Sequence, residues 1–185
     1  MNLNLPNTIT LGRIALIPVY VLLAYDPGPW RSFFAALVFL IAALTDFVDG
    51  YLARKHNQVT ALGKLLDPVA DKLLIIAGMV MLVDQGLAPA WIVILILGRE
   101  MAVTGLRAIA AADGVVMPAD RWGKWKTVLQ ITAIIMLVLS WKFWIFDVAI
   151  IGYWVLVASM VLTVYSGIRY GIAYLSGARE RAQGA

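Results

Sequence analysis

Cysteine is absent from this sequence of 185 residues, histidine occurs once, and only 14% of the residues are charged. Without cysteine the chain can form no disulfide framework and no thiolate metal site. A soluble domain is usually about a quarter charged and about half apolar, whereas 62% of this chain is hydrophobic and its mean hydropathy is +0.86. The net charge of +4 is modest and calls for no nucleic-acid partner, because basic residues also gather at the cytoplasmic face of membranes. These features predict an integral membrane protein.

The apolar residues are concentrated in six long segments, each close to the roughly 20 residues that a helix needs to cross a bilayer. No basic stretch precedes the first segment and no small-residue cleavage site follows it, so we interpret it as a retained helix and not as a secretory signal. The sequence therefore predicts an all-α membrane bundle that forms one domain over residues 1–185. The predicted spans are residues 8–25, 32–53, 67–83, 89–111, 126–141 and 147–170.

Basic residues are distributed unevenly between the predicted connections. One side of the membrane receives only Arg31 and Lys142. The other side receives Arg54, Lys55, Lys64, Arg107, Arg121, Lys124, Lys126, Arg169, Arg179 and Arg181. The positive-inside rule then predicts that both termini are cytoplasmic. Indole rings prefer the membrane interface, and on this orientation the outer interface receives Trp30, Trp91, Trp141, Trp144 and Trp154.

Four aspartates flank the connection between the second and third predicted spans: Asp46, Asp49, Asp67 and Asp71. The first two are three residues apart and the last two are four apart, and both spacings place side chains on one face of a helix. Acidic residues within spans are costly, and crowded carboxylates repel each other unless a cation intervenes. Oxygen ligands suit Mg²⁺ or Mn²⁺, and two ions about 3.5–4 Å apart could clamp a phosphate. The alternative is that these residues are helix caps and loop charges.

The residues between the two aspartate pairs are suited to a nucleotide. Gly50 and Ala53 are small enough to let a flat ligand approach the backbone. Arg54 can bind phosphate through its planar guanidinium, and Gly63 suits a turn before the third span. His56, the only histidine, is expected to be an exposed loop residue.

Residues 46–71 fit the pattern D-x2-D-G-x2-A-R-x8-G-x3-D-x3-D at every fixed position. This motif resembles that of the CDP-alcohol phosphotransferases. The stretches NLPNTITLGR, LDPVADK, REMAVTGLR and GKWKTVLQ are similar to the branch that makes phosphatidylglycerophosphate.

The resemblance implies six spanning helices, a homodimer, and a cavity open to the cytoplasm of a bacterial plasma membrane. It implies a centre of two Mg²⁺ or Mn²⁺ ions on the four aspartates, with Asp71 as general base. The donor nucleotide would contact Asp49, Gly50, Ala53, Arg54 and Gly63. The implied reaction transfers a phosphatidyl group from CDP-diacylglycerol to glycerol 3-phosphate.

An acceptor that carries a phosphate needs cations to bind it. Arg99 and Arg107 are the main candidates, because they lie on roughly one face of the fourth predicted span. Further candidates are Lys126, Arg169, Arg13 and Thr10. Two alternatives stay open: Arg99 forms a structural pair with Glu100, since buried charges are commonly paired, and Lys126 only faces anionic lipid.

Two other functions are compatible with these residues. The same donor could react with phosphatidylglycerol, as in a cardiolipin-type synthase, or with inositol phosphate. Intramembrane acids also mark ion pathways, which would indicate a transporter. Against a transporter, the four aspartates lie at one predicted membrane face, and no second acidic cluster lies opposite them.

Overall fold

The computed structural model describes the backbone of residues 5–56, 61–112, 121–140, 142–143 and 146–183. It describes the side chains of residues 8, 10–45, 69–112, 123–140 and 147–176. The described residues form six helices and one small hairpin. The helices are α1 (Leu5–Ala24), α2 (Pro29–His56), α3 (Ala61–Asp84), α4 (Ala90–Ala112), α5 (Arg121–Leu139) and α6 (Val148–Gln183).

Each predicted span corresponds to one helix, so the helical fold class is confirmed. Several local predictions are wrong, and the largest difference is in the sixth span, which was expected to end at residue 170, whereas α6 ends at Gln183. His56 is the last residue of α2 and not a loop residue, and Gly63 lies within α3 and not in a turn before it. The fifth span was expected to reach residue 141, whereas α5 ends at Leu139, and Ser140 follows with a φ of 43°. The length of an apolar run predicts which residues cross the membrane. It does not predict where the helix ends, because backbone hydrogen bonds can continue through polar residues.

The connections at one end of the bundle are short and well defined. At the end of α3, Gly86 has a φ of 70°. The Leu87 amide donates to the Leu82 carbonyl at 2.9 Å and the Gly86 amide to Val83 at 3.0 Å. This pair of bonds is a Schellman motif, which needs a residue in the left-handed region and so favours glycine. The chain therefore turns sharply into α4.

A two-residue hairpin joins α5 to α6. Strand β1 (Lys142–Phe143) pairs antiparallel with β2 (Phe146–Asp147). The Asp147 carboxylate accepts a hydrogen bond of 3.0 Å from the Ala149 amide, which caps the first turn of α6. This pairing was not predicted from the sequence, because two-residue strands leave no alternation of apolar and polar residues to detect.

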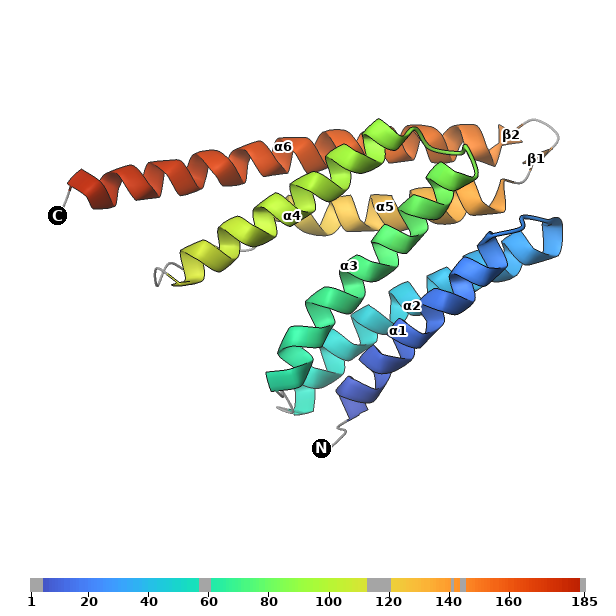
Figure 1. Cartoon of the computed structure of the whole chain (residues 1–185), viewed down its shortest axis with the longest axis horizontal. Helices are drawn as coiled ribbons and strands as arrows, with labels where there is room; N and C mark the ends of the chain where they lie inside the picture. Colours follow the sequence, from blue (N-terminus) through green and yellow to red (C-terminus); the bar gives the residue numbers. More distant parts are fainter. Residues whose placement is uncertain (1–4, 57–60, 113–120, 141, 144–145, 184–185) are drawn as a thin grey trace.

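Figure 1 shows helices that run alternately in opposite directions, so the connections α1–α2, α3–α4 and α5–α6 gather at one end. Helix α1 packs along α2 and α3, while α5 packs along α6, and α4 also lies on α6. Helix α2 contacts α5 and joins the two groups. The ends of α2 and α4 and the starts of α1, α3 and α5 therefore lie toward the other end (Figure 1).

The core of the bundle is tightly packed where α2, α3 and α5 meet. The Tyr20 and Phe39 rings lie 5.1 Å apart, and both side chains are fully buried. A Cβ on Gly78 would lie 2.8 Å from Phe39 Cε2 and 2.9 Å from Ile134 Cδ1. Glycine is required at this point of α3, because any larger residue would push the two neighbouring helices away.

Large apolar side chains also cover the outside of the bundle. Leu22, Trp30, Ile94 and Trp154 are each more than 60% exposed. In the described residues, one helical segment, Val148–Ser176, is long and apolar enough to cross a membrane, with a mean hydropathy of 2.1. Shorter apolar segments are Thr10–Ala24 and Pro29–Thr45. Trp141 and Trp144, which were predicted at the outer interface, lie outside the described residues.

Candidate active site

The two halves of the aspartate motif lie on consecutive helices. Asp46 and Asp49 belong to the second half of α2, and Asp67 and Asp71 belong to the first half of α3. The side chains of Asp46, Asp49 and Asp67 lie outside the described residues, as do the nucleotide candidates Gly50, Ala53, Arg54 and Gly63. The metal and nucleotide sites therefore stay predictions. Among the side chains that the structure describes, no group of three metal-ligating residues occurs.

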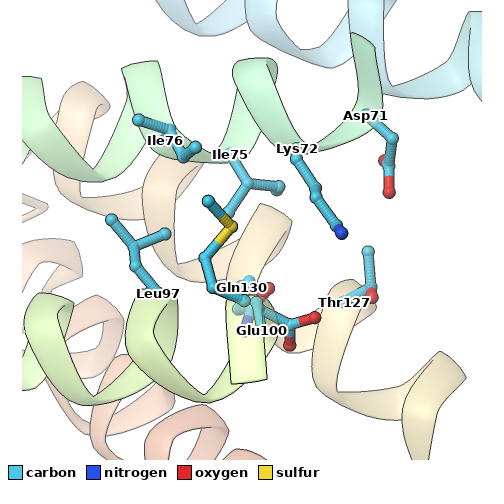
Figure 2. Close-up of a pocket in the computed structure, with 9 residues that line it drawn as sticks. Asp71, Lys72, Ile75, Ile76, Leu97, Glu100, Thr127 and Gln130 are labelled. Atoms are coloured by element: carbon cyan, nitrogen blue, oxygen red, sulfur yellow. The ribbon is translucent and has the colours of Figure 1, made fainter. Parts of the chain in front are cut away.

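Asp71 is the motif aspartate whose side chain is described, and it lines a pocket between α3, α4 and α5. Figure 2 shows Asp71, Lys72, Glu100 and Thr127 toward one side of this pocket and Ile76 and Leu97 toward the other. The remaining lining residues are Ile75, Met101 and Gln130. The pocket is thus polar beside the motif and apolar away from it, a combination that suits an amphiphilic substrate.

Lys72 is a cation of this pocket that was not singled out from the sequence. Its ammonium lies between the helices in Figure 2 and donates to the Thr104 hydroxyl on α4. That hydroxyl in turn donates to the Glu100 carbonyl at 2.8 Å. The available signal was its position directly after Asp71. Adjacent helix residues do not share a face, but the long stem of Lys72 reaches the pocket that Asp71 also lines.

Glu100 is the meeting point of two predicted cations. Its Oε1 accepts a hydrogen bond of 3.2 Å from Arg99 Nη1 and another from Lys126 Nζ. Lys126 is 8% exposed. A lysine that only faced anionic lipid head groups would be exposed, so this alternative does not fit. For Arg99 the structure has the alternative arrangement, an ion pair with Glu100. Arg99 Nη2 also donates to the Ser166 hydroxyl on α6 at 2.6 Å.

Arg107 lies two turns beyond Arg99 on α4 and is exposed. Its Nη2 donates to the Tyr170 hydroxyl on α6 at 2.9 Å, and its Cζ lies 5.1 Å from the centre of the Tyr170 ring. The guanidinium is therefore held by one aromatic side chain through both a hydrogen bond and a cation–π contact.

The other three acceptor candidates are not among the described residues that line this pocket. Thr10 is fully buried and Arg13 is 1% exposed. Arg13 Nε donates to the Thr45 hydroxyl on α2 at 3.5 Å. Both therefore belong to the packing of α1 on its neighbours. Arg169 is exposed on α6 and is not among the residues that line the pocket.

Comparison with known proteins identifies the family of this arrangement. The sequence profile of the CDP-alcohol phosphatidyltransferases matches residues 3–165. A CDP-diacylglycerol–glycerol-3-phosphate 3-phosphatidyltransferase of Bacillus subtilis is 43% identical, over 90% of this chain and 93% of the relative. Proteins of the same name from Rickettsia bellii and Pseudomonas fluorescens are 42% and 38% identical. The alignment with the Rickettsia bellii protein covers 90% of this chain and 93% of the relative, and that with the Pseudomonas fluorescens protein covers 91% and 88%.

Proposed function

The chain belongs to the CDP-alcohol phosphatidyltransferase family, and on that premise we propose that it transfers the phosphatidyl group of CDP-diacylglycerol to glycerol 3-phosphate. The observation that carries this proposal is identity of about 40% along nearly the whole length of relatives that bear this activity in their names. The pocket beside Asp71 adds support, because its lining combines the carboxylates of Asp71 and Glu100, the ammonium of Lys72 and an apolar wall.

In this reaction the sn-1 hydroxyl of the acceptor attacks the lipid-linked phosphorus of the donor. A new P–O bond forms, the P–O bond to CMP breaks, and CMP leaves with the electron pair. Asp71 accepts the hydroxyl proton, because a carboxylate at the pocket wall can act as a general base within hydrogen-bond reach. The remaining residues of the pocket hold and orient the two substrates, which is the main contribution of proteins to phosphoryl transfer.

The four aspartates, Asp46, Asp49, Asp67 and Asp71, are proposed to hold two Mg²⁺ or Mn²⁺ ions. An all-carboxylate donor set suits these hard cations. The backbone adds support, because the end of α2 and the start of α3 are joined by only residues 57–60. When bound, such ions supply charge stabilisation for the diphosphate and the departing CMP. The donor nucleotide is proposed to contact Asp49, Gly50, Ala53, Arg54 and Gly63, and the guanidinium of Arg54 can bind its phosphate.

The acceptor phosphate is proposed to bind Lys126 and Arg107, with Lys72 as a third cation. Lys72 lines the pocket, Lys126 bonds the pocket-lining Glu100, and Arg107 lies two turns beyond Arg99 on α4. Arg99 is assigned a supporting role, because its guanidinium is occupied by Glu100 and Ser166. The proposal leaves Thr10, Arg13 and Arg169 out of the acceptor site, because none of them lines the pocket, whereas Lys126 bonds the pocket-lining Glu100.

We further propose that the whole chain is one domain that crosses the bacterial plasma membrane six times, with both termini cytoplasmic, as a homodimer. The exposed apolar side chains on the outside of the bundle suit contact with lipid. The gathering of the motif helices at one end suits a cytoplasmic site (Figure 1). Lipid tails then stay in the bilayer while both head groups enter from water.

The test is an assay of the purified protein in detergent with CDP-diacylglycerol, Mg²⁺ and labelled glycerol 3-phosphate. The expected products are labelled phosphatidylglycerophosphate and one CMP for each lipid formed. Phosphatidylglycerol and inositol phosphate are supplied in parallel as competing acceptors. A product formed only from one of these would overturn the proposed acceptor, and cation flux in liposomes without CMP release would overturn the enzyme itself.

A further inference from the structure

Glu100 is out of place in a pocket that is proposed to bind a phosphate. Its carboxylate lines the pocket together with Asp71, and a second negative charge would repel an anionic acceptor. Lys126 and Arg99 both donate to the same oxygen, Oε1. The carboxylate is therefore neutralised by its neighbours, and the question is what this arrangement accomplishes.

Lys126 gains a fixed position from its bond to Glu100. A lysine side chain has four rotatable bonds in its stem and loses considerable entropy when it is held in one place. Here its side chain is only 10% exposed, and its described polar partner is Glu100 on the neighbouring helix. An ammonium group has three donors, so one bond to Glu100 leaves two hydrogen atoms that can bind a substrate oxygen.

Glu100 is itself held in place by Arg99. The side chain of Arg99 is 9% exposed and bonds both Glu100 and Ser166, so it joins α4 to α6. Within the described part of the chain, Arg99 Nε is a buried polar atom without a hydrogen-bond partner. A substrate cannot reach this buried atom, so Arg99 does not bind substrate through Nε. Its position is set by the bonds to Glu100 and Ser166 and by the packing of its stem.

Gly167 creates the space that Arg99 occupies. A Cβ at this position of α6 would lie 2.7 Å from Arg99 Cγ and 3.1 Å from Arg99 Nε. Gly171, one turn later on the same helix, has no neighbouring atom within 4 Å of the equivalent point. The absence of a side chain is therefore needed at Gly167 in particular, because the stem of Arg99 passes there.

We propose that Glu100 is a positioning residue for the acceptor site: it lines the pocket, holds the Lys126 ammonium beside it, and is itself fixed by Arg99 in the notch at Gly167. This inference deepens the proposed function and rests on it. Glu100 neither contacts the reacting atoms nor binds substrate. Its effect reaches the acceptor phosphate through Lys126.

The first test measures steady-state kinetics of Glu100→Ala, because the positioning role and simple electrostatics predict opposite signs. If Glu100 only repelled phosphate, its removal would lower the KM for glycerol 3-phosphate. If it positions Lys126, that KM rises about tenfold, which is the size expected for one hydrogen bond between charged groups. The KM for CDP-diacylglycerol stays within about twofold, since the donor does not depend on Lys126. A lowered or unchanged acceptor KM in an active variant would overturn the proposal.

A double-mutant cycle separates positioning through Lys126 from any other effect of Glu100. In a Lys126→Ala background, Glu100→Ala is expected to raise the acceptor KM no further. Independent effects that multiply in the double variant would refute the assignment. Glu100→Asp supplies a conservative variant that keeps the charge with a shorter stem, and partial rescue is expected.

The notch is tested by Gly167→Ala with Gly171→Ala as the matched control. Gly167→Ala is expected to raise the KM for glycerol 3-phosphate several-fold, while Gly171→Ala leaves it unchanged. Thermal unfolding in detergent with and without glycerol 3-phosphate gives a second readout: the stabilisation by this ligand shrinks in Glu100→Ala and Gly167→Ala. If Glu100→Ala does not fold, Glu100→Gln and Gly167→Ala decide the matter by the same two measurements. Equal ligand stabilisation in those variants and wild type would overturn the proposal.

The two levels of inference fail in different ways. A wild-type protein that forms no phosphatidylglycerophosphate refutes the proposed function. A wild-type protein that forms it, together with a Glu100→Ala variant of unchanged acceptor KM, refutes only the positioning role.

Discussion

Arg107 on α4 donates from Nη2 to the hydroxyl of Tyr170 on α6 at 2.9 Å, and its Cζ lies 5.1 Å from the centre of the same ring. Arg99 Cζ lies 5.9 Å from that ring. One tyrosine therefore faces both arginines that the sequence identifies on α4. This contact and the Arg99–Ser166 bond fix α4 against α6 beside the proposed acceptor site.

The first prediction concerns the way Tyr170 holds Arg107. Tyr170→Phe removes the hydroxyl but keeps the ring, whereas Tyr170→Leu removes both contacts. We expect the KM for glycerol 3-phosphate to rise about threefold in the first variant and about tenfold in the second. Partly exposed contacts to a charged group and to an aromatic face each contribute about 0.5–1.5 kcal/mol. Tyr165→Phe, at an exposed position of α6, is the control. Equal effects of Phe and Leu would show that the ring contributes nothing.

The second prediction concerns the general base. Asp71→Asn keeps the shape of the side chain but cannot accept the acceptor's proton, so CMP release should fall about 10²- to 10⁴-fold. Loss of a metal ligand would add to this effect. The far-ultraviolet circular dichroism spectrum should not change. Asp84→Asn, at the opposite end of α3 and exposed, should retain full activity. Wild-type turnover in Asp71→Asn would remove Asp71 from the chemistry.

The third prediction concerns Lys72. Lys72→Ala removes the ammonium that bonds Thr104 at the pocket wall. We expect the KM for glycerol 3-phosphate to rise about tenfold, because a cation near a phosphate contributes roughly 1–2 kcal/mol. Lys124→Ala, at an exposed position of α5, serves as the control. If both lysine variants behave alike, Lys72 has no special part in the pocket.

The fourth prediction concerns the metal ions. Treatment with EDTA should abolish CMP release, and Mg²⁺ or Mn²⁺ should restore it, because the four aspartates proposed as ligands would bind such ions through oxygen. Zn²⁺ should restore little, since the chain contains no cysteine and one histidine. Melting temperatures with and without Mg²⁺ show whether the ion also stabilises the fold. Full activity after exhaustive chelation would contradict the two-metal assignment.

The fifth prediction concerns stability and not activity. Gly78→Ala places a methyl group 2.8 Å from Phe39 Cε2 and 2.9 Å from Ile134 Cδ1. Both neighbours are fully buried, so overpacking should destabilise the bundle by about 1–3 kcal/mol. The melting temperature in detergent should fall accordingly. Gly105→Ala, on a helix position with no atom within 4 Å, should leave it unchanged or raise it slightly. A Gly78→Ala variant as stable as wild type would show that α2 and α5 move apart freely.

Local features of the sequence were enough to predict the helices. Long apolar runs and the Pro, Gly and Asp residues between them identified all six, although α6 continues to Gln183, well beyond the predicted end at residue 170. The spacing of the aspartates likewise placed them on two consecutive helices. Periodicity and composition are properties of neighbouring residues, and the backbone hydrogen bonds of a helix are also local. The hairpin and the polar last turns of α6 escaped prediction because they lack such a signal.

The chemistry of the pocket was predictable only in part. The motif identified Asp71, and the charge on α4 and α5 identified Arg107 and Lys126. The partners of these cations come from other helices: Lys126 meets Glu100 across 26 residues of sequence, and Arg99 meets Ser166 across 67. The burial of Arg13 and the entry of Lys72 into the pocket also depend on how helices pack.

The sequence by itself determined that this chain forms apolar helices and carries an acidic motif at the junction of two of them. These properties follow from the order of residues along the chain, because both the helical period and the spacing of the motif are local. The tertiary structure alone decided which charges are neutralised and which face the pocket. A side chain's electrostatic role depends on the atoms within a few ångströms of it, and those atoms belong to helices that meet only when the bundle has formed.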